Sequence, residues 1–443
     1  MRPVPKGELT VTNQFRLSRR SLLGLTTATA AGVALAACGD DGGSGGSGSA
    51  KKIRWWHIAN TDPMMSAWAT MAHQFEAAHP GVKFEITPLE NEAFKTKITT
   101  VVQAGDPPDI FHTWGGGVLF QQADAGMVKD LTQDVGAWRD TLIPAALDAY
   151  STGGKTYASA VDTGMVGFWY NKELFDRAGI SAPPATWADY LDAVRRLKAA
   201  KITPIALAGK EKWPGHYYWA YLAMRVGGLD ALRQAAVDKN FNTPDFTAAG
   251  AHLAELVALQ PFQTGYLAAG YSTADGQAAT MGNGKAAMEL MGQWAPVTER
   301  DNSAGKKGLR DKLGFFAFPA VDGGKGKITD AFGGGGGFSV GKGAPPEAVE
   351  FLKFIAQPEN ARTEAKTAGV LPVVKAAADA VTDPNLKLVA ETLANSTGFQ
   401  LYLDQAYAPA VGQQVNDSVA ELLAGKASPE QVVKAITTAA KQG

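Results

Sequence analysis

Apolar residues alternate or recur at helical spacing throughout residues 51–114. Residues 51–58, 83–89 and 108–114 each have the pattern of a short strand. A helical segment lies in each of the two intervals between these strands. The first carries one apolar face with spacings of three and four residues, formed by Met64, Trp68, Met71, Phe75 and Ala78. This order of elements predicts an α/β fold that opens with a largely parallel sheet.

Strands and helices continue to alternate further along the chain. Thr186 and Asp189 have the spacing of a capping box at the start of a helix. Residues 284–296 predict a strand followed by a turn, and five consecutive glycines at 333–337 precede another short strand. Pro429 stands where a proline suits the first position of a helix. We find no internal repeat.

The ends of the first three strands carry polar or glycine-rich segments. These segments are residues 60–62 (NTD), 90–92 (ENE) and 113–117 (TWGGG). Ligands of open α/β sheets bind beyond the carboxyl ends of the strands. The three segments are therefore the first places to expect binding residues.

The N-terminal 50 residues have the pattern of an export signal followed by a tether. Paired arginines, Arg19 and Arg20, precede a short uncharged apolar run, which is the twin-arginine pattern. Residues 35–38 (LAAC) have the pattern of a bacterial lipobox that ends at Cys38, the one cysteine of the chain. We expect residues 1–37 to be the signal, Cys38 to carry a lipid, and residues 38–50 to be a flexible Gly/Ser tether. A buried free thiol is the alternative for Cys38.

Composition narrows the classes of partner and cofactor. The formal net charge of −1 gives no basic stripe for nucleic acid, and no cysteine after Cys38 remains for a disulfide or a thiolate metal site. We expect no cofactor, no metal site and a monomer. The six histidines do not fall at metal-binding spacing: His57, His73, His79, His112, His216 and His252.

Three short motifs resemble catalytic or nucleotide-binding signatures but lack the right context. Residues 337–341 (GFSVG) match a nucleophile elbow around Ser339, yet no histidine follows in the chain. Residues 336–343 lack the Ser/Thr of a phosphate loop, and residues 282–287 lead into a predicted strand rather than a helix. We therefore expect Ser339 to be an ordinary strand residue.

Five segments, in order, resemble one known family. They are the lipobox, FEAAHPGVKFE, GDPPDIF, YNKELFDRAGISAPPATWADY and GKAAMELMGQWA. Together they resemble the sugar-binding lipoproteins of ABC importers, known as extracellular solute-binding protein family 1 of the maltodextrin-binding type. The likeness is strongest to actinobacterial binders of xylobiose and cello-oligosaccharides.

This resemblance implies a two-lobe, periplasmic-binding-protein-like fold (type II). Each lobe would be an α/β sheet flanked by helices, with the ligand cleft between the lobes. Lobe 1 would comprise residues 51–160 and 324–372, and lobe 2 residues 161–323 and 373–443. The chain would cross between lobes near Ala160, near residues 323–329 and near Pro372.

A sugar needs flat apolar surfaces for its C–H faces and paired donors and acceptors for its hydroxyls. Among the tryptophans, Trp294 stands where the family places a stacking indole, and Trp114 and Trp213 lie beside glycines. For both of these, a packed aromatic under a loop is the alternative. The polar candidates, chosen because charge-assisted hydrogen bonds suit hydroxyls, are Asn60, Asp62, Glu92, Asp162, His216 and Asp404.

Some candidates have a structural alternative. Asn60 and Asp62 could cap a helix, and Glu92 could be a first-turn acid favoured by the helix dipole. Gly334 and Gly335 would let the backbone approach a ligand closely, or form a loose turn.

The sequence as a whole predicts an extracellular, lipid-anchored binding protein of an ABC importer. It would take an oligosaccharide from xylan or cellulose, deliver it to a permease, and break no bond. A secreted glycosidase is the alternative from another class, with Asp62 and Glu92 as its carboxyl pair. A third possibility keeps the fold and changes the ligand to a peptide, polyamine or phosphate compound.

Overall fold

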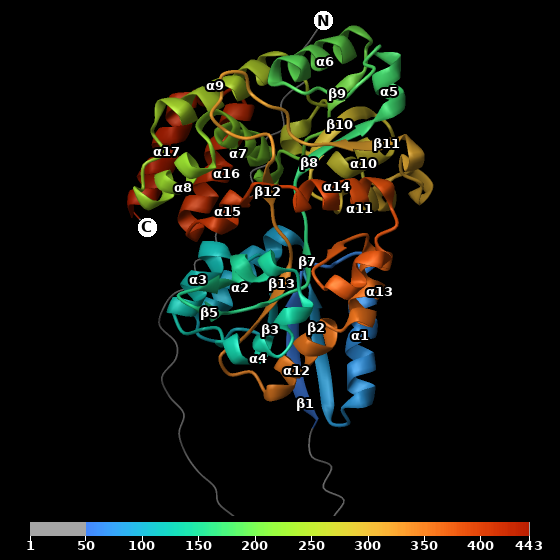
Figure 1. Ribbon diagram of the computed structural model, residues 1–443, viewed down its shortest axis with the longest axis vertical. Coiled ribbons are helices and arrows are strands. Elements are labelled where there is room, and N and C mark those ends of the chain that lie inside the picture. Colours follow the sequence, from blue (N-terminus) through green and yellow to red (C-terminus); the bar gives the residue numbers. More distant parts are fainter. Residues whose placement is uncertain (1–49, 443) are drawn as a thin grey trace, which may run out of the picture. The chain divides into compact units, whose positions relative to one another are not determined.

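The computed structural model describes residues 50–442. The predicted export signal, the lipidation site Cys38 and all of the tether except Ala50 lie outside these residues. Within them, strands and helices alternate and build two separate sheets and two hydrophobic cores, which confirms the α/β fold class (Figure 1). The two cores lie in two halves of this body, each described below.

The first half is built on a five-stranded sheet with the strand order β2-β1-β3-β13-β6. Strands β1, β2 and β3 run parallel, as expected, whereas β13 is antiparallel to both of its neighbours. The strand bounds are β1 Lys51–His57, β2 Val82–Pro88, β3 Ile110–Thr113, β6 Ser159–Ala160 and β13 Gly337–Val340. Ser339 lies in β13 with its hydroxyl bonded to the Tyr157 carbonyl, which is the strand role expected for it.

Helices cover both faces of this sheet. They are α1 Met64–Ala78, α2 Asn91–Gln103, α3 Gly116–Asp124, α4 Thr132–Gly136, α12 Pro346–Ile355 and α13 Pro358–Ala368. The predicted apolar face of α1 is the one that is buried, through Trp68, Met71 and Phe75. The first core therefore forms between β1 and helices whose sequence periodicity already marks their inner face.

The second half is built on a four-stranded sheet with the order β11-β8-β10-β9. Its strands are β8 Gly167–Asn171, β9 Thr203–Ile205, β10 Ala286–Met291 and β11 Leu313–Phe316. All six residues of β10 are buried, including the carboxyl residue Glu289. The predicted strand at 284–296 is thus the central strand of a sheet covered on both faces.

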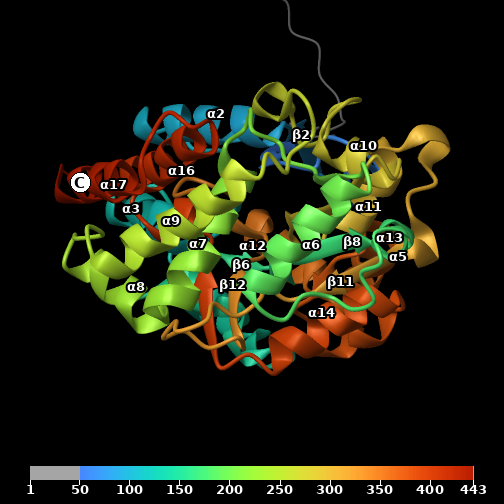
Figure 2. The same cartoon turned by 90° about the horizontal axis from the view of Figure 1, so that it is seen from above.

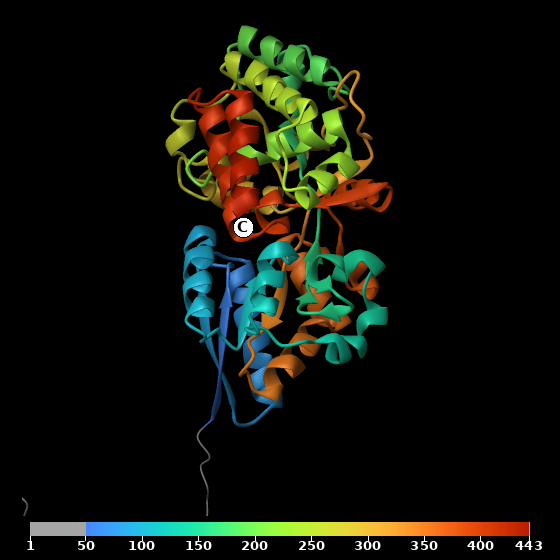
Figure 3. The same ribbon diagram turned by 90° about the vertical axis from the view of Figure 1, so that its left-hand side faces the viewer.

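Eleven helices of the described chain surround this second sheet. They are α5 Lys172–Arg177, α6 Trp187–Ala199, α7 Trp213–Gly227, α8 Leu229–Val237, α9 Pro244–Ala258, α10 Gln277–Gly282, α11 Ala295–Asn302, α14 Pro384–Ala394, α15 Leu403–Ala406, α16 Pro409–Leu423 and α17 Pro429–Gln442. Helix α7 is buried along almost its whole length. The C-terminal helices α16 and α17 lie side by side and pack near α7 and α9 (Figures 2 and 3).

Two small strand pairs lie near the crossings between the halves. Strand β7 (Asp162–Thr163) pairs with β14 (Leu371–Pro372), and β12 (Asp330–Gly333) pairs with β15 (Gly398–Leu401). The remaining pair, β4 (Ser151–Thr152) with β5 (Lys155–Thr156), is a hairpin of the first half. The chain thus crosses near 161 and 372, close to two of the expected places.

The other crossing differs from its expected place. Ala331 and Phe332 belong to the second core, and Phe338 belongs to the first. The crossing therefore lies in the glycine run after β12 rather than at 323–329, because Phe332 is buried against α7 of the second half. Val373, Val374 and Ala377 pack in the first core, whereas the predicted boundary at 372 assigned them to lobe 2.

Candidate functional site

The glycine run at 333–337 lies against the other crossing segment. A methyl group on Gly335 would lie 2.0 Å from the carbonyl oxygen of Asp162, and one on Gly334 would lie 2.6 Å from the ring of Tyr402. Both positions therefore require glycine. The close approach made by Gly334 and Gly335 is to other parts of the protein, and their approach to a ligand stays a prediction.

Asp162 is held at this crossing by the backbone of the glycine run. Its Oδ1 accepts a hydrogen bond of 2.6 Å from the Gly336 N–H. The Tyr150 hydroxyl donates to the Gly335 carbonyl at 3.1 Å. Burial raises the pKa of Asp162 to about 7, against the opposing effect of the Gly336 bond. The carboxyl of Asp162 is thus poised between its charged and neutral forms near neutral pH.

A second buried acid lies near Asp162. Glu364 on α13 accepts a hydrogen bond of 2.8 Å from the Trp68 indole N–H. Burial, together with the charge of Asp162, raises the pKa of Glu364 to about 8. Glu364 is therefore mostly protonated at neutral pH.

Aromatic rings form a continuous wall in the second half, next to the crossings. Tyr402 stacks on Tyr217 with ring centroids 5.7 Å apart, and Trp213 lies 5.6 Å from Tyr217. Trp294 lies 6.5 Å from Trp213 and 6.4 Å from Tyr402. Trp213, Tyr217 and Tyr402 are buried, whereas Trp294 is only half-buried. Trp294 is therefore the member of this aromatic wall that keeps ring surface for a ligand.

The position of Trp294 follows from its place between β10 and α11. It is the N-cap residue of α11, one turn after the buried strand ends. The Trp169 indole N–H donates to the carbonyls of Met291 and Gly292, at 3.1 Å each, and so fixes this turn from below. The strand-to-helix turn thus presents the indole of Trp294 on a rigid support.

Charged residues from both halves meet beside this wall. Lys95 Nζ on α2 lies 3.0 Å from Asp404 Oδ2 on α15 and 3.2 Å from Glu92 Oε1. The Lys95 ammonium also lies 5.6 Å from the ring centroid of Trp114. Trp114 packs against both cores. Three predicted residues, Glu92, Trp114 and Asp404, are therefore joined through one lysine.

His216 lies behind Asp404 on α7. It is fully buried, and burial is the main cause that lowers its pKa to about 4, with Asp404 acting in the opposite direction. The imidazole is therefore neutral at neutral pH. Burial acts to raise the pKa of Asp404, but the charge of Lys95 outweighs it and holds that pKa below its ordinary value, so the carboxylate stays charged.

Asn60 and Asp62 lie apart from these groups. Asn60 is exposed before α1. Asp62 Oδ1 accepts bonds from the backbone N–H and the hydroxyl of Ser66, at 3.2 Å and 2.5 Å, so it caps the first turn of α1. This is the structural alternative named for Asp62, and no contact joins Asp62 to Glu92 among the described residues.

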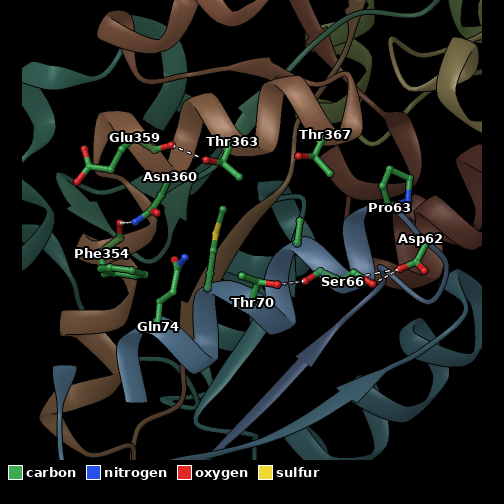
Figure 4. A pocket seen from close by; sticks show the side chains of 12 residues that line it. Asp62, Pro63, Ser66, Thr70, Gln74, Phe354, Glu359, Asn360, Thr363 and Thr367 are labelled. Atoms are coloured by element: carbon green, nitrogen blue, oxygen red, sulfur yellow. Dashed lines mark hydrogen bonds between the residues drawn. The ribbon is translucent and has the colours of Figure 1, made fainter. Parts of the chain in front are cut away.

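Asp62 also stands at one end of a groove of about 780 Å³ between α1 and α13 (Figure 4). Polar side chains of the two helices, among them Thr70 and Thr363, face one another across it, and Met71 and Phe354 also line it. Hydroxyl groups in the walls are already bonded to their own helices, as Thr70 is to the Ser66 carbonyl. The groove contains none of the aromatic wall.

Sequence reasoning missed several residues of this region. Lys95 sits in a run of polar residues on α2, and Tyr402 lies in a segment from which only Asp404 was chosen. Glu289 and Glu299 form a buried acid pair in the second half, with exposures of 0% and 1%. Burial raises the pKa of Glu289 to about 7. Such a pair is too deeply enclosed to meet a substrate.

The geometry thus joins most of the predicted residues in one region, which we call the junction site. It comprises Glu92, Trp114, Asp162, Trp213, His216, Trp294, Gly334, Gly335 and Asp404, together with Lys95, Tyr217 and Tyr402. The aromatic face of Trp294 and the charged carboxylate of Asp404 suit a ligand rich in hydroxyls and C–H faces, with the buried His216 imidazole behind the carboxylate. The ligand-binding role of each residue stays a prediction.

Residues 50–442 contain neither a metal-binding cluster nor a helix that could span a membrane. No cluster of three or more His, Cys, Asp or Glu side chains there has metal-binding geometry. No helix in that part is both long enough and apolar enough to cross a bilayer.

Comparison with known proteins identifies the family. Residues 59–362 match the family described as bacterial extracellular solute-binding protein, so the match covers well over half of the chain. The chain belongs to this family, which confirms the resemblance seen in the sequence. Its members are binding proteins rather than enzymes and work on the extracellular side of the membrane.

Individual relatives agree with this family. The "Multiple sugar-binding protein" of Streptococcus mutans is 26% identical over 333 residues, covering 73% of this chain and 72% of the relative. An ABC transporter extracellular-binding protein of Pyrococcus horikoshii, uncharacterized, is 25% identical over 388 residues, with 84% and 83% covered. These matches extend over most of both chains.

Two solved structures share the fold and exceed 25% sequence identity. A chain from a study of xylan utilization by Caldanaerobius polysaccharolyticus is 28% identical with a TM-score of 0.80, covering 88% of this chain and 99% of that one. A "Chitin oligosaccharide binding protein" is 26% identical with a TM-score of 0.83, covering 89% and 99%. The two-lobe solute-binding fold expected from the sequence is thereby confirmed.

Proposed function

We propose that this protein binds an oligosaccharide at the junction site and delivers it intact to the permease of an ABC importer. The observation that carries the proposal is the half-buried indole of Trp294 beside Trp213, Tyr217 and Tyr402, with the Asp404 carboxylate nearby. Indole faces suit the C–H faces of a pyranose, and carboxylates suit its hydroxyls.

The proposed ligand is a β-linked oligosaccharide from xylan or cellulose, such as xylobiose. Xylan and chitin are both β-linked polysaccharides, and the two structural relatives above come from work on these materials. Another relative is named for sugars outside the β-linked class. The "Melibiose/raffinose/stachyose-binding protein MelE" of Bacillus subtilis is 27% identical over 158 residues, 34% of this chain and 35% of that one. The two structural relatives, which cover 88% and 89% of this chain, support the β-linked class.

No bond is made or broken in this proposal. Asp62, one of the two carboxyls named for a glycosidase, caps α1, and Glu92 pairs with Lys95. Four buried acids have raised pKa values: Asp162, Glu289, Glu299 and Glu364. Glu289 and Glu299 are enclosed in the second half, Asp162 accepts a hydrogen bond from the Gly336 N–H, and Glu364 accepts one from the Trp68 indole. Prolonged incubation with xylobiose should therefore release no free xylose.

The proposal extends to the N-terminal segment. Cys38 would carry a lipid and hold the monomeric binding domain at the outer face of the cell membrane. Replacing Cys38 with serine in the producing cells should move the protein from the membrane fraction to the medium. Retention of the Cys38→Ser protein in the membrane fraction would remove the lipid anchor from the account.

Calorimetric titration tests the binding proposal. Xylo-, cello-, chito- and malto-oligosaccharides of two to four units are titrated into the protein, with peptides and a polyamine as non-sugar controls. We expect one β-linked series to bind at micromolar concentration or tighter. Binding of no sugar below millimolar concentration would show that the ligand class is wrong.

A further inference from the structure

One ion pair joins the two halves close to the junction site. Lys95 on α2 belongs to the first half, and Asp404 on α15 belongs to the second, 309 residues further along the chain. Their charged atoms lie 3.0 Å apart, with side-chain exposures of 26% and 9%. Because the pair is largely shielded from water, its attraction is screened much less than that of a surface pair.

The groups around the Lys95 side chain favour its charged form. Glu92 lies 3.2 Å from the ammonium on the first half, and the Trp114 ring lies 5.6 Å away. Burial acts to lower the pKa of Lys95, but the two carboxylates raise it above its ordinary value. The lysine therefore stays charged, and without it two carboxylates would face one another across the two halves.

The backbone beside this ion pair is also closely packed. A methyl group on Gly116, at the start of α3, would lie 2.5 Å from the carbonyl oxygen of Gln405 on α15. One on Gly117 would lie 2.6 Å from the carbonyl carbon of Tyr407. Gly116 and Gly117 thus allow the backbone of the first half to pack closely against α15. The Lys95–Asp404 ion pair is the charged part of this contact.

We propose that Lys95 is a latch residue: from α2 it holds Asp404 in place and keeps the two halves of the body together. Separation of the halves must break this ion pair and leave the Asp404 carboxylate without its partner. The latch therefore sets the balance between joined and separated forms of the protein. It concerns the protein without any ligand, so it does not depend on which solute is bound.

The test measures the distance between the halves in sugar-free protein. Spin labels are attached to Thr100→Cys on α2 and Lys426→Cys after α16, both exposed positions, in the full chain with Cys38→Ser. Double electron–electron resonance then gives the distribution of distances. In the Lys95→Met protein we expect a roughly tenfold larger population at longer distance, as fits the loss of one partner of a half-buried ion pair.

Matched variants separate the latch from a general disturbance. Lys97→Met removes an exposed lysine from the same helix and should leave the distribution unchanged. Lys95→Arg should retain the joined form, because a guanidinium can also pair with Asp404. Asp404→Asn should act like Lys95→Met, and the double variant should add nothing further. Thermal unfolding by circular dichroism confirms that each variant is folded.

Two results would overturn the latch. One is a Lys95→Met distribution that matches those of wild type and Lys97→Met. The other is a double variant in which the effects of Lys95→Met and Asp404→Asn simply add. If the Lys95 variants behave as predicted but the protein binds no sugar, the latch proposal stands and only the proposed ligand is refuted.

Discussion

A methyl group on Gly292 would lie 2.2 Å from the indole ring of Trp294, so the ring rests directly on the backbone of the turn that follows β10. This relationship makes the position of the indole a property of a rigid strand-to-helix turn. A substitution at Gly292 can therefore displace the indole while Trp294 itself stays in the protein.

Replacement of Trp294 by alanine should lower oligosaccharide affinity about 30-fold or more. A buried aromatic anchor of a binding site typically contributes about 2 kcal/mol or more when truncated. Calorimetry with the tightest-binding sugar measures the loss. An affinity within threefold of wild type would show that Trp294 is not a stacking platform.

Gly292→Ala should reduce affinity in the same direction while the indole stays in the protein. The added methyl group displaces the ring from its support, so near-ultraviolet circular dichroism of the tryptophans should also change. Gly343→Ala is the matched control, since a methyl group there has no atom within 4 Å and the site is distant in sequence. Equal affinities for Gly292→Ala and Gly343→Ala would contradict this account of the turn.

Glu364 should make stability fall as the pH rises. Its pKa of about 8 in the folded protein exceeds the ordinary value of 4.5, so its stabilising contribution is present in acid and is lost as the pH rises through about 8. The whole shift corresponds to on the order of 5 kcal/mol. Glu364→Gln keeps an acceptor for Trp68 and should flatten the decline in melting temperature between pH 5 and pH 9.

Glu359→Gln supplies the control for this experiment, because Glu359 is an exposed acid on the same helix, α13. It should leave the pH profile of the melting temperature as in wild type. A Glu364→Gln profile as steep as that of wild type would mean that this carboxyl is ionised in the folded protein at neutral pH.

Asp62→Ala should cost stability and leave sugar affinity unchanged. Loss of the bonds to Ser66 removes the cap of α1, an effect of about 1 kcal/mol on the free energy of unfolding. Asp62→Asn keeps an acceptor and should recover most of that stability. A tenfold loss of affinity in a normally stable Asp62→Ala protein would instead make Asp62 a ligand-binding residue.

The fold was predictable where local pattern determines it. The spacing of Trp68, Met71 and Phe75 marked the buried face of α1, and the order of elements up to β3 indicated the parallel strands correctly. These features depend on neighbours within one helix or strand, which a sequence displays directly.

The candidate site was predictable only in part. Trp294 was chosen because it stands in a family motif, and Asp162 because it stands near a predicted crossing. Lys95 was missed because its partner is 309 residues away, and nothing on α2 distinguishes Lys95 from Lys97. Pairings across the two halves depend on how the tertiary fold brings distant segments together, and a local sequence pattern does not show this.

The glycine run at 333–337 is a second case in which the sequence did not show which distant residues a segment contacts. Five glycines in a row indicated a close approach or a loose turn, without saying to what. The backbone of Asp162 and the ring of Tyr402 occupy the space that side chains at 335 and 334 would need. The crossing therefore falls inside the run, several residues after its expected place.

A crystal structure of the protein with its tightest-binding β-linked oligosaccharide tests the central claim most directly. The account predicts a sugar ring in van der Waals contact with the Trp294 indole, with hydroxyls hydrogen-bonded by residues of the junction site from both halves. A sugar bound in the groove between α1 and α13, or anywhere that leaves Trp294 untouched, would contradict it.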